Sequence, residues 1–158
     1  MPGSLSYPED FTAGDFFMEK TAEHMRQTLG VSTVLITYYQ APAWKKSAAG
    51  TEFPKMLVPN ILYREVVQEN MYIEIEDCFK HPSYKFINLK MNLPAIRFIG
   101  CHPIVDETKK VIGAFTLIDG KARTLSAGDI AILNCACAMT HYHLKTPAVA
   151  KPEDNSRT

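Results

Sequence analysis

Hydrophobic residues recur with helical spacing in residues 15–29, the first clearly patterned part of the chain. The apolar positions that share one side of such a helix are Phe17, Met18, Ala22, Met25 and Leu29. Charged and polar residues fill most of the other side. Thr12 or Asp15 can cap the start, because either side chain accepts hydrogen bonds from free N–H groups of the first turn. The pattern predicts a surface helix that stops at Gly30.

Four stretches have the composition or alternation of β-strands. Residues 31–39 (VSTVLITYY) are rich in β-branched and aromatic residues. Residues 71–77 (MYIEIED) alternate as a half-exposed strand does. Residues 95–105 and 111–118 are joined by the polar turn DETKK and are mostly apolar on both faces. This last pair is therefore predicted at the centre of its sheet.

Strand alternation also predicts which side chains of residues 111–118 share a face. Two groups of three result: Val111, Phe115 and Leu117 on one face, and Ile112, Ala114 and Ile118 on the other. Residues 41–51 are turn-like, with a weak edge strand at 44–47, where two lysines would discourage edge-to-edge pairing.

Two more helices are predicted, separated by a long connection. Residues 59–70 (PNILYREVVQEN) carry a proline near the first turn, where its missing N–H costs nothing. The last helix starts in SAGD, where Ser126 and Asp129 resemble a capping box. Residues 130–139 contain only one clearly polar residue, more apolar surface than one sheet face requires, which indicates a second partner surface. Residues 78–94 are long for a connection and are typical of a lid or binding segment.

Length and charge limit the classes of function. The chain has 158 residues, enough for one domain with a real core, and its 17 basic and 17 acidic residues cancel. No basic field is available to attract nucleic acid or anionic lipid, so neither is an expected partner. Without a signal sequence or an apolar run near the roughly 20 residues of a membrane span, a cytoplasmic location is expected. We expect an N-terminal arm at 1–14, a domain at 15–144 and a flexible tail at 145–158.

Three segments, RFIGCHPI, VIGAFTLID and LSAGDIAIL, resemble the fourth strand, fifth strand and last helix of a GAF domain. This is the small-molecule sensory domain found beside bacterial sensor kinases and diguanylate cyclases. AWKKS and IEDCFKHPSY resemble its second strand and its aromatic loop. The resemblance implies an α+β sandwich with a central antiparallel sheet of five to six strands. It places the N- and C-terminal helices on one face and a ligand pocket, roofed by the second helix and the long loop, on the other.

The pocket implied by the resemblance would need apolar walls and a few polar groups. The candidate ligand-binding residues are Trp44, Tyr63, Phe79, His81, Tyr84, Phe98, Cys101 and Thr116. Phe86 is a further aromatic candidate for the wall. The alternative is that these aromatic side chains simply fill the core.

The four cysteines give little support for catalysis or a cofactor. Cys101 and His102 are neighbours on a predicted strand, so they project to opposite faces and cannot converge on one metal or substrate. Cys135 and Cys137, two apart on a helix, cannot bridge within one chain. Across a dimer, however, either could meet its symmetry mate as a redox switch.

The cysteine positions of bilin-binding GAF domains and of free-methionine-sulfoxide reductases are not matched, so no covalent chromophore is expected. No metal is expected either, because His141 and His143, two apart on a helix, do not share one face. The signature of cyclic-nucleotide-binding members is incomplete.

The sequence therefore predicts a non-catalytic sensory domain that binds a small molecule of unspecified identity. The resemblance implies a homodimer through the terminal helices, and an output on a signalling kinase or cyclase in trans. Two alternatives remain open: a dimerisation module whose pocket has closed over its own side chains, and a thiol-based redox sensor or small redox enzyme using Cys101. A filled interior between Trp44, Tyr63, Phe79 and Phe98 would favour the module.

Overall fold

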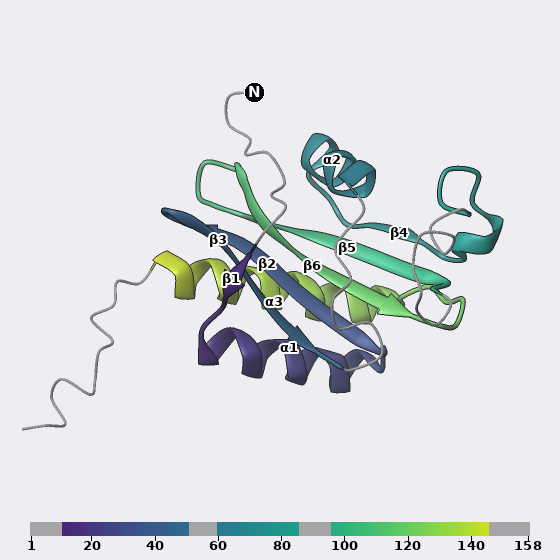
Figure 1. The fold of residues 1–158 in the computed structure, drawn as a ribbon, viewed down its shortest axis with the longest axis horizontal. Helices are drawn as coiled ribbons and strands as arrows, with labels where there is room; N and C mark the ends of the chain where they lie inside the picture. The colour runs from purple at the N-terminus through teal and green to yellow at the C-terminus, as the bar shows by residue number, and fades with distance from the viewer. Residues whose placement is uncertain (1–10, 51–59, 86–95, 146–158) are drawn as a thin grey trace, which may run out of the picture.

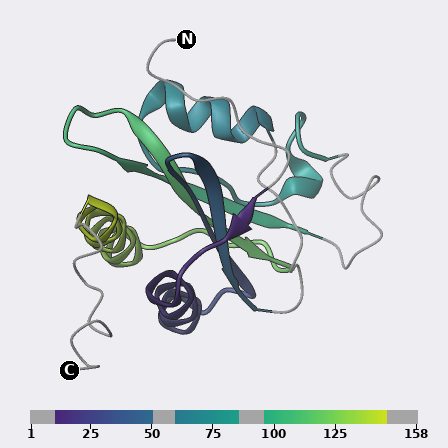
Figure 2. The same ribbon diagram turned by 60° about the vertical axis from the view of Figure 1, so that its left-hand side comes forward.

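The computed structural model describes residues 11–50, 60–85 and 96–145. One six-stranded sheet separates two layers of helix (Figures 1 and 2). The helices are α1 (Phe16–Leu29), α2 (Asn60–Glu69) and α3 (Ala127–Lys145), with a short 3₁₀ helix, η1, at Cys78–Lys80. The strands are β1 (Thr12–Ala13), β2 (Thr33–Gln40), β3 (Ala43–Ala49), β4 (Ile73–Ile75), β5 (Phe98–Val105) and β6 (Val111–Asp119). α1 and α3 cover one face and α2 the other, as predicted.

The sheet runs in the order β1-β3-β2-β6-β5-β4. All pairings are antiparallel except that of β1 with β3, which is parallel, with Thr12 opposite Lys45. The predicted α+β sandwich, with a central antiparallel sheet of five to six strands, is therefore confirmed, and the short parallel pairing of β1 at one edge makes the whole sheet mixed. The prediction of a weak edge strand at residues 44–47 is also corrected. β3 is seven residues long and is hydrogen-bonded to β1 on one side and β2 on the other, so the edge strand is β1.

Both predicted caps are present. The Asp15 carboxylate accepts from the Met18 N–H at 2.9 Å, and Gly30 ends α1 in the left-handed region at φ 69°. At α3, the Asp129 N–H donates to Ser126 Oγ at 3.0 Å, and the Ser126 N–H donates to Asp129 Oδ2 at 3.4 Å. These bonds satisfy backbone donors that a helix start leaves free, which is why the sequence located both starts.

An irregularity in the β5–β6 pairing changes one predicted face. Ile104 pairs with Gly113 and Val105 pairs with Val111, so Ile112 lies between two registers. An extra residue of this kind reverses the alternation of the residues before it. Ile112 therefore packs beside Phe115 and Leu117 under α1 and α3, and Val111 faces α2. The prediction was wrong for Val111 and Ile112 and right for the other four positions.

Two apolar cores lie on the two faces of the sheet. The helix-side core, under α1 and α3, includes Met18, Leu29, Phe98, Phe115 and Leu133. The α2-side core includes Leu35, Leu62, Val66, Ile99 and Ile118. The burial of apolar area on both faces is the main term that stabilises such a three-layer arrangement.

Candidate functional site

The α2-side core contains much of the predicted pocket. Trp44 comes from β3, Tyr63 from α2 and Tyr84 from the turn after η1, and all three are buried. The Trp44 and Tyr63 rings meet edge to face, with centroids 6.3 Å apart. His81, half-buried, lies edge-on to Tyr84 at 4.9 Å. The structure thus brings these aromatic groups together, and they fill much of the space between α2 and the sheet themselves.

Cys101 and Thr116 face this core from the two central strands. They are opposite each other in the β5–β6 pairing, and Thr116 Oγ1 lies 3.9 Å from Cys101 Sγ. Both side chains are fully buried. Burial raises the pKa of the Cys101 thiol to about 12, although the contact with Thr116 lowers it slightly. Cys101 is therefore a protonated thiol at neutral pH, which is a poor nucleophile.

The Tyr84 hydroxyl is a polar group in this apolar environment. It is buried, and it has no hydrogen-bond partner within the part of the chain that the structure describes. Burial, with a smaller contribution from Glu65, raises its pKa above the ordinary value. A buried hydroxyl of this kind gains free energy from a partner that supplies a hydrogen bond.

Two of the eight predicted site residues lie elsewhere. Phe79 is 45% exposed, and the Arg97 guanidinium lies over its ring at 4.6 Å. Phe98 is fully buried in the helix-side core, on the opposite face of the sheet from Trp44 and Cys101. Phe98 and Cys101 are three positions apart on β5, so strand alternation separates them. Phe98 therefore cannot line the α2-side core, and the predicted set is corrected by its removal. Phe86 lies outside the described residues.

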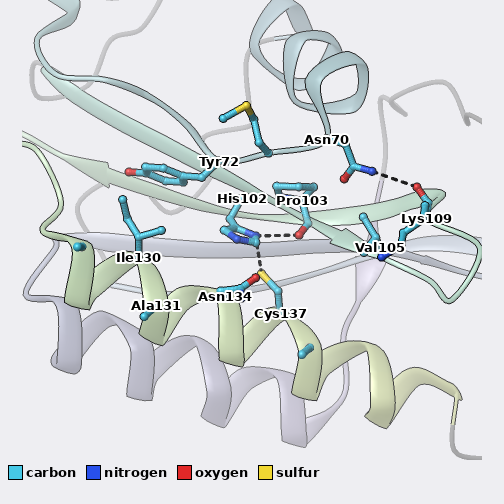
Figure 3. Close-up of a pocket in the computed structure, with 13 residues that line it drawn as sticks. Asn70, Tyr72, His102, Pro103, Val105, Lys109, Ile130, Ala131, Asn134 and Cys137 are labelled. Carbon is cyan, nitrogen blue, oxygen red and sulfur yellow. Dashed lines mark hydrogen bonds between the residues drawn. The ribbon is translucent and has the colours of Figure 1, made fainter.

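The prediction that Cys101 and His102 face opposite ways is confirmed, and His102 has a different cysteine as its neighbour. Its Nδ1 lies 3.1 Å from Cys137 Sγ and 2.9 Å from the Pro103 carbonyl oxygen (Figure 3). Burial lowers the pKa of His102 and raises that of Cys137 well above its usual value. Both groups are therefore uncharged at neutral pH. No local pattern predicts this pair, because it joins a strand to a helix 35 residues later. The one signal in the sequence is that His102 and Cys137 belong to a strand and a helix that are expected to pack against each other.

A cavity of about 740 Å³ adjoins this pair, between α3 and the β4–β5 side of the sheet. We call it the α3 cavity. Six of its lining residues can offer polar groups: Asn70, Tyr72, His102, Lys109, Asn134 and Cys137. Aliphatic side chains, among them Ile130 and Val105, supply the remaining walls (Figure 3). Within the described residues, no group of three His, Cys, Asp or Glu side chains could hold a metal ion.

Comparison with protein families finds the GAF domain, matched over residues 16–140. The chain belongs to the GAF domain family. GAF domains are generally small-molecule sensory domains, so the fold and the broad class of function predicted from the sequence are confirmed. No curated protein matches the sequence.

Solved GAF structures share this architecture at low sequence identity. A GAF/HD domain protein from Geobacter sulfurreducens is 13% identical, with a TM-score of 0.61 over 86% of this chain and 95% of that one. The blue-light-absorbing PixJ GAF domain of Thermosynechococcus elongatus is 13% identical, with a TM-score of 0.63 and coverages of 87% and 88%. The type II free methionine-R-sulfoxide reductase of Thermoplasma acidophilum is 15% identical, with a TM-score of 0.63 and coverages of 81% and 89%. At such identities the likeness is evidence for the fold alone.

The outer surface of this GAF domain carries an apolar groove between α1 and α3, with a volume of about 560 Å³. Phe17 and Met25 line it from α1, and Ile132, Cys135 and Met139 line it from α3. Ile132 is 41% exposed and Met139 63%. Ile132 and Met139 are seven residues apart on α3, so they leave apolar side chains exposed on one face of the helix. None of the helices in residues 11–50, 60–85 and 96–145 is both long and apolar enough to cross a membrane.

Thiol labelling of the native GAF domain is expected to modify Cys135 first. Cys135 is exposed, whereas Cys78, Cys101 and Cys137 are buried and have raised pKa values. Brief treatment with iodoacetamide at neutral pH, on protein dilute enough to leave the groove between α1 and α3 uncovered, should add one adduct per chain by intact mass, and none to a Cys135→Ser variant. All four cysteines should react in denaturant. Rapid native labelling of Cys101 would contradict this and would restore the reading in which Cys101 is a redox-active thiol.

Proposed function

We propose that this GAF domain is a non-catalytic sensor that binds a small molecule and signals in trans as a homodimer. The α2-side core is the ligand site that the family resemblance implies, with Tyr84 and Thr116 as the polar groups that would orient a ligand. The raised pKa of Cys101 supports a non-catalytic role for the thiol that contacts Thr116. A ligand would change the output only if it bound one arrangement of the helices better than another.

The groove between α1 and α3 is the feature that best supports the proposed homodimer. Its exposed Ile132 and Met139 would be covered by the same surface of a second copy, since a two-fold interface joins identical patches. His143 holds the two helices together at one end: its Nε2 lies 2.9 Å from Asp15 Oδ2, and its ring stacks on Phe17 at 4.0 Å. A shift of either helix would therefore change the shape of the groove, which is the proposed dimer interface.

Native mass and absorbance spectra of protein that has not been dialysed test both parts of the proposal. We expect a dimer that carries an additional non-protein mass. Met139→Glu should weaken dimerisation at least tenfold, which corresponds to about 1.4 kcal/mol, because a carboxylate would be buried in an apolar seam. Phe79→Glu is the matched control, since Phe79 is also exposed but lines neither the groove nor the α3 cavity.

The outcomes separate the sensor from its main alternative. An apo dimer that takes up no ligand in a subsequent metabolite screen would favour the interaction module. The packing of Trp44, Tyr63 and Cys101 in the α2-side core already supports that second candidate. A monomeric wild-type protein, or a dimer that Met139→Glu leaves intact, would contradict the proposed interface.

A further inference from the structure

We propose that the α3 cavity is a second small-molecule site, which takes an uncharged, planar heteroaromatic compound. It lies on the α1/α3 face of the sheet, opposite the α2-side core, and so goes beyond the proposed function. The inference does not depend on the homodimer or on a ligand in the α2-side core.

The size and walls of the cavity fit such a compound. Its volume of about 740 Å³ lies within the range of roughly 300–1,000 Å³ that is usual for small-molecule sites. The rings of Tyr72 and His102 both line the cavity, with their centroids 6.2 Å apart and their planes tilted by 33°; we call this pair of neighbouring rings the aromatic floor (Figure 3). Ile130 of α3 borders the same space. A flat ring can lie over this floor and contact both layers.

Polar groups at the cavity are available for a hydrogen-bonding ring edge. The amide of Asn134 offers both a donor and an acceptor, and it makes no hydrogen bond to another described residue. His102 uses Nδ1 for Pro103 and Cys137, which leaves Nε2 for a ligand. The Tyr72 hydroxyl, by contrast, already donates to Glu74 at 2.7 Å. Asn134 and His102 are therefore the polar contacts that we assign to the ligand.

The charge at the cavity favours a neutral compound. His102 and Cys137 are uncharged at neutral pH because both are buried. Lys109 is the only lining residue of the cavity with a formal charge in the described part of the chain. The carboxylate of Glu74 lies behind Tyr72 and is bonded to its hydroxyl. At the inner end of the cavity, beside the half-buried His102 and the buried Cys137, a charged group would lose hydration without gaining a partner of opposite charge.

A ligand in this position would contact the inner side of α3. Ile130, Asn134 and Cys137 line the cavity, while Ile132 and Met139 of the same helix line the outer groove. Occupancy that favours one position of α3 relative to β5 would therefore change the surface offered to a second copy.

The test is a titration of the 158-residue chain with nicotinamide and adenine, both neutral at pH 7.5, followed by NMR. Benzoate is the anionic comparison. We expect saturable shifts of the His102 ring resonances at probe concentrations of about 1 mM, with no shift of the Trp44 indole N–H. Trp44 is the only tryptophan and lies in the α2-side core, so it reports on the other site.

Variants on the exposed side of the cavity identify the contacts. Asn134→Ala should weaken probe binding about threefold to tenfold through loss of a hydrogen bond, and Ala138→Trp should abolish it by filling the space. Gln68→Ala, an exposed amide on α2 outside the cavity, should leave it unchanged. Shifts at Trp44 in place of His102, unchanged affinity in both cavity variants, tighter binding of benzoate, or no saturable binding of either neutral probe would each overturn the proposal. Failure of the homodimer or of ligand binding in the α2-side core would leave these readouts unaffected.

Discussion

Replacing Phe115 by alanine is expected to lower the free energy of unfolding by about 4 kcal/mol. Phe115 is fully buried at the centre of β6, which pairs with β2 on one side and β5 on the other. Its ring belongs to the helix-side core, where α1 and α3 pack on the sheet. Truncation removes apolar contacts and leaves a cavity that close-packed neighbours cannot fully close. This loss is a large fraction of the 5–15 kcal/mol by which most domains are stable.

Urea denaturation followed by circular dichroism measures this loss, and Phe79→Ala is its matched control. Phe79 is 45% exposed, and its main described contact is the Arg97 guanidinium above its ring. We expect a loss of only about 1 kcal/mol there, the size of an exposed cation–π contact with some apolar area. Equal losses in the two variants would show that the helix-side core is not the more tightly packed region.

The two variants also separate the helix-side core from the Asp77–Arg97–Phe79 cluster. Phe115→Ala loosens the support of α1 and α3, the helices that carry the outer groove. Phe79→Ala leaves that support intact and alters only the Asp77–Arg97–Phe79 cluster beyond the edge of the α2-side core. In that cluster Asp77 bonds Arg97 Nε at 3.1 Å and accepts from the Phe79 N–H at 3.1 Å. If Phe115→Ala changes dimerisation and Phe79→Ala does not, the packing of the helix-side core affects the surface that α1 and α3 offer to a second copy.

Local signals made much of the fold predictable from the sequence. Asp15 caps the start of α1 and Gly30 ends it, and Ser126 with Asp129 caps the start of α3. Such caps were predictable because they depend only on residues within one turn of the helix end. The central hairpin was predictable because a run that is apolar on both faces belongs inside a sheet. In contrast, β1 is two residues long and carries no alternation, so its parallel pairing with β3 had no local signal.

The candidate site was less predictable, because it depends on side chains that meet across different elements. Trp44, Tyr63, Tyr84, Cys101 and Thr116 do converge on the α2 side, as the resemblance implied. Phe98 does not, and the alternation that separated Cys101 from His102 would also have separated Phe98 from Cys101. The His102–Cys137 pair and the α3 cavity arise from the docking of α3 on β5. The position of α3 relative to β5 depends on the packing of the whole helix-side core, and no short sequence motif determines it.

The second large effect is expected from one added methyl group, in Gly113→Ala, which should cost about 3 kcal/mol. Gly113 lies opposite Tyr38 in the β2–β6 pair, and a Cβ there would overlap the Thr37 carbonyl oxygen and lie 2.8 Å from Tyr38 Cα. Both are backbone atoms of the neighbouring strand, so relief requires the two central strands to separate. Those strands carry the pairing on which both cores are built.

The matched control is the same substitution at Gly128, for which the opposite sign is expected. Gly128 lies in the first turn of α3, and the nearest atom to an added Cβ is Ser126 Oγ at 3.8 Å. Alanine restricts the unfolded chain and favours the helix, so Gly128→Ala should raise the free energy of unfolding by about 0.5 kcal/mol. Thermal and urea denaturation of both variants would measure the difference. A Gly113→Ala protein as stable as the wild type would mean that β2 and β6 can move apart at no cost in stability. It would contradict the expectation that α1 and α3 pack on a rigid central pair of strands.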